Sequence, residues 1–142
     1  MPHKFHQKGM IYLKKSGFRF SNPTISKISY FLHPEFTPSE SSLSIENAFN
    51  TQISQDEDNC QAVVDLNIVL GDEDPSKAPF YINLTVCAAF KWEAGYSEDT
   101  VRTLLSINAP ALLLGYARPI VASITNMSPY PAYNIPFYNF TV

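Results

Sequence analysis

The side chains that could do chemistry in this chain are few and widely separated. His3 and His6 have a spacing that occurs in metal sites, but they lie near the start of the chain and no third ligand accompanies them. His33 precedes Pro34 and has no evident partner nearby, so we expect it in a loop. The sequence therefore predicts no metal site.

Two clusters of carboxylates could supply the acid and base of a hydrolytic site. They are Asp56-Glu57-Asp58 and Asp72-Glu73-Asp74. Each cluster lies in a polar, turn-like stretch, and the strand expected between them would hold them at opposite ends of a sheet. They could not share a substrate there. We interpret them as solvated turn charges, with weak cation binding as the alternative.

The two cysteines also lack a catalytic setting. No histidine lies within plausible reach of Cys60 or Cys87, so a thiolate nucleophile is not expected. A Gly-rich phosphate loop is absent as well. Ten Phe and eight Tyr stand beside only three His. This balance favours a protein that binds and is not an enzyme, without a cofactor.

Length and composition narrow the class further. The chain has 142 residues, which suits one domain, and its 45% apolar and 16% charged residues exclude general disorder. The net charge of −3 argues against nucleic-acid binding. No unbroken apolar run approaches the ~18 residues of a membrane span, and no secretory signal is evident. We expect a soluble, cytoplasmic protein.

Charge is distributed unevenly along the chain. Six of the ten basic residues precede the first acid, Glu35, and the rest of the chain carries thirteen acids and four bases. We expect residues 1–16 to form a flexible basic arm and residues 17–142 to form one domain. The arm is either a solvated tail or a docking element for an acidic partner. The acidic body would attract basic partners.

Three segments alternate apolar and polar residues with period two, which is typical of half-buried strands. They span residues 43–53, 60–70 and 80–92, and a shorter strand is expected over 23–32. Folding the second and third segments about Pro75 pairs Leu70 with Phe80 and Val64 with Val86, so one face is apolar throughout. The same pairing places the two cysteines on opposite faces, where they cannot form a disulfide.

Helical periodicity replaces this alternation after Gly95. Ser97 can cap a first helix, whose first turn carries two acids. A second helix restarts near Pro110, spans residues 109–125 and is apolar nearly all round, with Arg118 as its only charge. We expect Arg118 to reach the surface or to pair with a carboxylate. The predicted fold is α+β, a four-stranded antiparallel sheet with C-terminal helices packed on one face.

The last fourteen residues, 129–142, combine three Pro with five aromatic residues and have no regular period. This tail is either a lid that completes the core or one wall of a groove for extended apolar peptide. The second helix poses a similar question. A helix that packs on a sheet needs only one apolar stripe, and this helix is apolar on more than one face. Its remaining apolar face is covered either by the tail or by another subunit.

The order of these elements and three of their motifs resemble the SecB family of protein-export chaperones. Residues 79–98 are similar to the family's last strand and the acidic start of its helix. Residues 109–118 (APALLLGYAR) resemble its P-x-x-L-F-P-Y-A-R, and residues 134–140 (NIPFYNF) resemble its L-x-P-x-N-F. Leu114 and Gly115 depart from the family's Phe and Pro. The sequence ends two residues after Phe140, without the family's tail for docking on the translocase motor SecA.

This resemblance implies an ATP-independent holdase that binds unfolded or partly folded polypeptides and assembles into dimers or a dimer of dimers. It also implies protein export as a role, with SecA as a partner. The alternative is a SecB-like interaction subunit dedicated to one partner, such as an antitoxin. The residues expected to contact clients are Leu112, Tyr116, Tyr130, Tyr133, Phe137, Tyr138 and Phe140. Those expected at the subunit interface are Leu113, Ile120, Val121 and Ile124.

Overall fold

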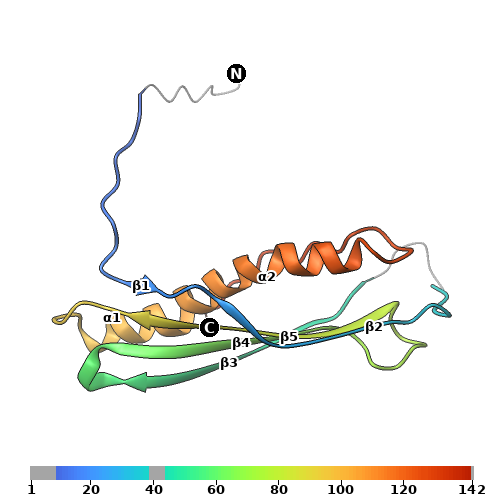
Figure 1. Ribbon diagram of the computed structural model, residues 1–142, viewed down its shortest axis with the longest axis horizontal. Helices are drawn as coiled ribbons and strands as arrows, with labels where there is room; N and C mark the ends of the chain where they lie inside the picture. The colour runs from blue at the N-terminus through green and yellow to red at the C-terminus, as the bar shows by residue number, and fades with distance from the viewer. Residues whose placement is uncertain (1–8, 39–43, 142) are drawn as a thin grey trace.

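The computed structural model describes residues 9–38 and 44–141 as an antiparallel sheet covered on one face by a long helix (Figure 1). The first half of the expected basic arm, residues 1–8, lies outside the described residues. So does Leu43, which the sequence analysis placed at the start of a strand. The predicted α+β class is confirmed.

The sheet contains five antiparallel strands, where the sequence predicted four. They are β1 (Arg19–Phe20), β2 (Thr24–Leu32), β3 (Asn47–Asp56), β4 (Gln61–Gly71) and β5 (Phe80–Lys91). The order is β1-β5-β4-β3, and β2 also pairs with β5. Since β1 and β2 follow one another along the same edge of β5, the sheet is still four strands wide. The additional strand is the short segment just before the one that was expected.

The β4–β5 hairpin has a register two residues away from the predicted one. Leu70 pairs with Ile82 and Val64 with Ala88, in place of Phe80 and Val86. The hairpin folds about Ser76 and not about Pro75, and β4 ends at Gly71, whose φ of 78° lies in the left-handed region. A shift by an even number of residues keeps every side chain on its face. The predicted division into an apolar and a polar face therefore survives the wrong register.

The two faces of the sheet differ sharply in chemistry. On the face covered by the helix, β4 and β5 place fully buried side chains that form the core with the helix. On the opposite face, the Asn67 Nδ2 donates to Asn83 Oδ1 at 2.7 Å and to Thr85 Oγ1 at 2.9 Å. Burial of the first face supplies most of the stabilising apolar area. Its most buried large side chains are Leu66, Ile68, Leu70, Ile82, Leu84 and Phe90.

The covering helix is continuous, where the sequence predicted two separate helices. It consists of α1 (Glu98–Thr103), a π-helical turn (Leu104–Asn108) and α2 (Ala109–Thr125). Its start is as expected, because the Ser97 Oγ accepts the Thr100 N–H at 3.1 Å. Pro110 brings no N–H to the carbonyl of Ser106, and its ring would crowd that carbonyl in a regular helix. The wider π turn just before Pro110 relieves this conflict and lets the helix continue.

This continuous helix, Glu98–Thr125, is long and apolar enough to cross a membrane when judged by length and composition alone. The sequence did not indicate such a span, because polar residues interrupt every apolar run in this segment. The core helix of a globular domain passes the same test. Here Leu113, Ala117 and Val121 are fully buried in the core cluster that includes the sheet, which is the arrangement of a core helix.

Candidate binding surface along the helix and tail

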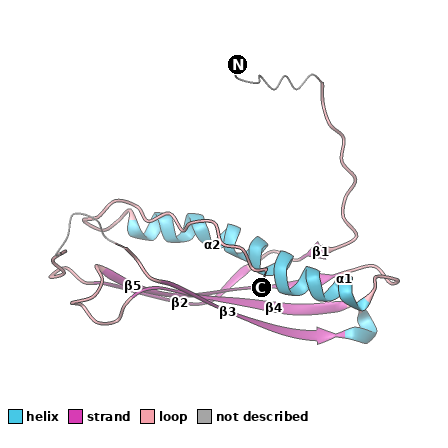
Figure 2. Ribbon diagram, turned by 180° about the vertical axis from the view of Figure 1, so that it is seen from behind, coloured by secondary structure: helices cyan, strands magenta, loops and turns pink. Residues whose placement is uncertain are grey.

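The C-terminal tail, here residues 126–141, turns back after α2 and runs beside the helix (Figure 2). It has no regular secondary structure, as predicted, but it makes specific contacts. The Tyr133 ring lies 6.0 Å from the Phe80 ring, and Tyr138 and Phe140 lie 4.7 and 6.1 Å from Phe49 of β3. The tail therefore packs over the helix-covered face of the sheet on its β3 side.

Polar groups fix the first half of the tail. The Tyr133 N–H donates to Thr125 Oγ1 at 2.7 Å, and that buried hydroxyl donates to the Val121 carbonyl at 2.8 Å. The Asn47 Nδ2 donates to the Tyr133 hydroxyl at 2.8 Å. The Tyr130 hydroxyl donates to the Phe36 carbonyl at 3.2 Å. These bonds join the tail to the end of α2, to β3 and to the segment after β2.

Arg118 fixes the second half of the tail. Its Nε donates to the Ile135 carbonyl at 3.0 Å and its Nη2 donates to the Pro136 carbonyl at 2.8 Å. Its Cζ lies 4.9 Å from the centre of the Phe137 ring, within cation–π range. The expected carboxylate partner is wrong, since the ion pair that the structure records in its described part is Arg102–Asp99. Arg118 instead satisfies two main-chain carbonyls of an irregular segment.

This anchoring leaves some predicted client-contact residues open and covers others. Phe137 is 94% exposed, and Tyr116 and Tyr138 are about half exposed. The other four, which pack partly against the core or the tail's anchors, are Leu112, Tyr130, Tyr133 and Phe140. The tail is thus both a lid over the core and a carrier of open aromatic rings. The exposed Phe137 and Tyr138, together with the partly buried Phe140 next to them, are called the tail surface below.

Tyr116 belongs to a different surface. Its ring meets Phe20 of β1 at 6.1 Å, on the sheet edge opposite β3. Ile25 and Ile28 of β2 lie on the same edge, and all four side chains are 44% exposed because the helix does not reach over this edge strand. These four residues are called the β2-edge surface below. The sequence analysis grouped Tyr116 with the tail and missed its three neighbours.

The expected interface set needs a correction. Leu113 and Val121 are fully buried within the chain's own core, so a neighbouring subunit cannot reach them. Ile120 and Ile124 are only partly buried, and they remain available. In a helix that is apolar all round, the sequence does not reveal which stripe faces the sheet. Leu113 and Val121 belong to that stripe, so their assignment to the subunit interface was wrong.

Within residues 9–38 and 44–141, the titratable groups do not assemble into a catalytic site. The two carboxylate clusters lie at opposite ends of the sheet, as predicted, in the β3–β4 and β4–β5 connections. Hydrogen bonds, chiefly from Asn59, lower the pKa of Asp56, and hydrogen bonds from Ser76 lower the pKa of Asp74. Burial, with a contribution from the neighbouring Asp65, raises the pKa of the Cys87 thiol to about 11, so it is a poor nucleophile at neutral pH.

His33 has a structural partner that the sequence did not reveal. Its Nε2 lies 2.8 Å from the carbonyl oxygen of Asp72, which is 39 residues away in the chain. The imidazole is buried, and its backbone N–H donates to the Pro79 carbonyl. The residue therefore joins the end of β2 to the β4–β5 loop. In the described part of the chain, no group of three or more His, Cys, Asp or Glu side chains could hold a metal ion.

Comparison with known families identifies this architecture. The family model described as "Preprotein translocase subunit SecB" matches residues 11–142. The chain belongs to the SecB family. Proteins of this family are chaperones and not enzymes. The resemblance drawn from the motifs in residues 79–140 is thereby confirmed.

Solved structures show the same SecB-like fold. The SecB-like chaperone Rv1957 of Mycobacterium tuberculosis, in complex with a ChAD peptide from the HigA1 antitoxin, matches with a TM-score of 0.69 and 13% identity. The match covers 86% of this chain and 91% of that one. A Streptococcus agalactiae protein of unknown function matches with a TM-score of 0.50 and 17% identity, over 84% and 97% of the two chains. No curated protein matches by sequence.

Proposed function

We propose that this SecB-family protein is an ATP-independent holdase that binds unfolded or partly folded polypeptides in the cytoplasm, without a cofactor or catalytic activity. The observation that carries the proposal is Phe137, a large aromatic side chain that is 94% exposed on a segment fixed by Arg118. An exposed apolar ring held in a fixed position can bind extended chains through the apolar area that the contact buries. Because the ring is already fixed, little conformational entropy is lost on binding. The tail surface is then the contact for clients.

Replacing Phe137 by alanine should weaken client binding without unfolding the protein. We expect three- to tenfold more variant to be needed to suppress aggregation of an unfolded client, measured by light scattering, because a contact ring of this kind contributes about 1 kcal/mol. The exposed site predicts a change of less than about 1 kcal/mol in the free energy of unfolding. Met127→Ala, 86% exposed beyond the end of α2, is the matched control. Equal activity of both variants would contradict the assignment.

A second function is favoured by the Mycobacterium tuberculosis relative, whose structure holds a peptide from an antitoxin. A SecB-like subunit dedicated to one partner needs the same exposed aromatic rings, but it does not need to bind many different polypeptides. Three unrelated unfolded clients separate the two functions. Suppression of aggregation for all three supports a general holdase, with export through SecA as one outlet. Failure with all three, together with a single dominant protein in pull-downs, supports the dedicated subunit.

Assembly of copies through the β2-edge surface accompanies this proposal. Four apolar side chains at 44% exposure, three of them on the edge strands β1 and β2 and the fourth, Tyr116, on α2, form a self-complementary contact when two copies meet at the edge whose backbone groups are unpaired. We expect light scattering to give a mass that is a multiple of 16.0 kDa. Ile28→Asp should lower that mass, because it places a charge in the contact. A wild-type monomer would exclude assembly at this edge.

A further inference from the structure

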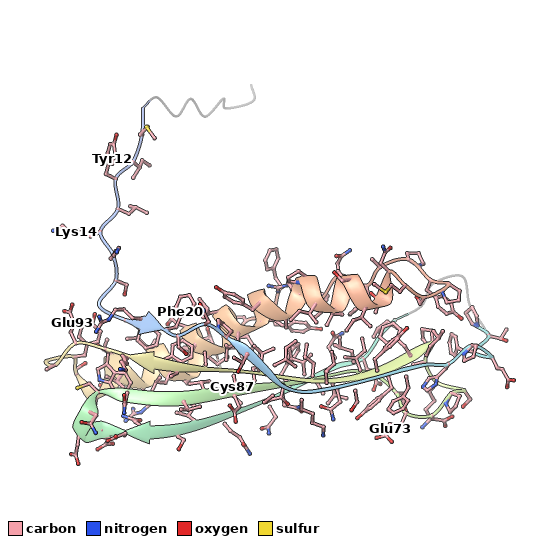
Figure 3. All side chains as sticks on the ribbon, viewed as in Figure 1. Tyr12, Lys14, Phe20, Glu73, Cys87 and Glu93 are labelled. Carbon is pink, nitrogen blue, oxygen red and sulfur yellow. The ribbon has the colours of Figure 1, made fainter. Side chains whose placement is uncertain are left out.

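Residues 9–16 form an extended arm that leaves the body of the protein beside β1 (Figure 3). The arm contains four consecutive large apolar residues, Met10, Ile11, Tyr12 and Leu13, which are 66–87% exposed. Lys14 and Lys15 follow directly. Single exposed apolar residues are common, but a run of four on a surface marks a site of interaction.

A pocket of about 370 Å³ lies at the same end of the molecule, between the end of β3 and the helix start. Ile53, Trp92, Val101 and Leu105 give it apolar walls, and Tyr96 also lines it. A concave site of this size, with polar side chains among its apolar walls, can take a few side chains of an extended segment. Phe18 and Phe20 pack on Phe90 at the root of the arm, which fixes the root to the body of the protein.

The charges around this pocket complement those of the arm. Glu57 and Glu98 line the pocket, and the adjoining segments carry Asp56, Asp58, Glu93 and Asp99. Arg102 lines the pocket too, but Asp99 pairs with it at 3.2 Å. Two lysines next to an apolar run thus match a pocket that combines apolar walls with an acidic surround. Opposite charges of this kind select the partner and its orientation.

The arm also begins at the wall of the pocket. A β-carbon at Gly17 would clash with the Tyr96 hydroxyl and the Glu93 side chain, so the arm's root lies directly against Tyr96. From there the described arm runs away from its own body (Figure 1). Because root and pocket share one end, two copies that meet end to end can each offer an arm to the other. Such an exchange is a closed, two-fold arrangement.

We propose that Met10–Lys15 of one copy docks in the pocket of a second copy, with apolar side chains against Trp92, Val101 and Leu105 and with Lys14 and Lys15 beside Glu57 and Glu98. The inference does not depend on client binding or on the β2-edge surface. It assigns the exposed arm a binding partner, and it assigns the pocket a natural occupant.

Trp92 allows a direct test, because it is the chain's single tryptophan and lines the pocket. The acceptor is the full chain with Met10, Ile11, Tyr12 and Leu13 all replaced by serine, which keeps the pocket and lacks the apolar arm. The donor is the full chain with Trp92→Phe, which keeps the arm and does not emit. We expect added donor to shift the acceptor's Trp92 emission saturably. Urea unfolding of each variant checks that it is folded.

Two further donors make the outcome decisive. A donor that combines Trp92→Phe with the four serines should leave the emission unchanged. A donor with Lys14→Glu and Lys15→Glu as well as Trp92→Phe should bind at least tenfold more weakly at low salt, since both contacts with carboxylates become repulsive. If the intact donor causes no shift, each arm lies in its own pocket or in none, and exchange between copies is wrong. Equal binding by intact and charge-reversed donors would overturn the assigned carboxylate contacts.

Discussion

Gly71→Ala should lower the free energy of unfolding by about 3 kcal/mol. Gly71 ends β4 with a φ of 78°, a conformation that costs an alanine about 1–2 kcal/mol. A β-carbon there would also overlap the main-chain carbonyl oxygen of Phe80, and main chain in a hairpin cannot move aside without loss of pairing. Crowding of this kind adds about 1–3 kcal/mol. Urea unfolding followed by circular dichroism measures the loss.

Gly115→Ala is the matched control with the opposite sign. Gly115 lies inside α2, and no atom would come within 4 Å of a β-carbon at this position. Alanine has a higher helix propensity than glycine, by about 1 kcal/mol in an exposed helix. We therefore expect a gain of up to about 1 kcal/mol. If both substitutions changed the free energy of unfolding by similar amounts, the left-handed φ and the close contact at Gly71 would not contribute to the stability of the hairpin.

Arg118→Met should release the second half of the tail from the helix. The substitution keeps the length of the side chain but removes both hydrogen bonds to the tail carbonyls and the contact with the Phe137 ring. Hydrogen bonds from a charged donor contribute about 1.5–3 kcal/mol, and partial exposure places the combined loss near 2 kcal/mol. Chymotrypsin should then cleave after Phe137 and Tyr138 about thirtyfold faster, because cleavage requires local opening of the tail.

Arg102→Met tests whether loss of any helix arginine has this effect. Arg102 is exposed and pairs with Asp99 three residues earlier, a surface ion pair that contributes about 0.5 kcal/mol or less. Cleavage of the tail should remain at the wild-type rate in this variant. Arg118→Met should also weaken client binding if Phe137 needs its fixed position. Unchanged cleavage of the tail in Arg118→Met would mean that the aromatic packing on Phe49 holds the tail by itself.

The elements were predictable because they depend on local patterns. Period-two alternation located β4 and β5, and the bounds of α2 agree with the predicted residues 109–125. The hairpin register was not predictable in the same way, since it depends on the shape of a loop and on the sign of φ at Gly71. The π turn escaped notice because Pro110 is equally acceptable at the start of a helix and after a wider turn.

The candidate surface was only partly predictable, for a different reason. The aromatic content identified the tail. The contacts of Arg118 could not be predicted, because its partners are main-chain carbonyls and every residue has one. Leu113 and Val121 were misplaced because the rotation of an apolar helix about its axis is set by its fit to the sheet. Tyr116 was grouped with the wrong neighbours because the strand order determines which sheet edge a side chain faces.

The π turn between α1 and α2 has a consequence for how this polypeptide can change over evolution. An α-helix advances by about 100° of azimuth per residue, and a π turn accommodates one residue more in its circuit. Losing a single residue from Leu104–Asn108 would therefore turn the π turn back into an α turn and leave α1 and α2 in nearly the same rotation about the helix axis. It would also bring the ring of Pro110 against the carbonyl four residues earlier, so such a deletion should be tolerated only together with replacement of Pro110.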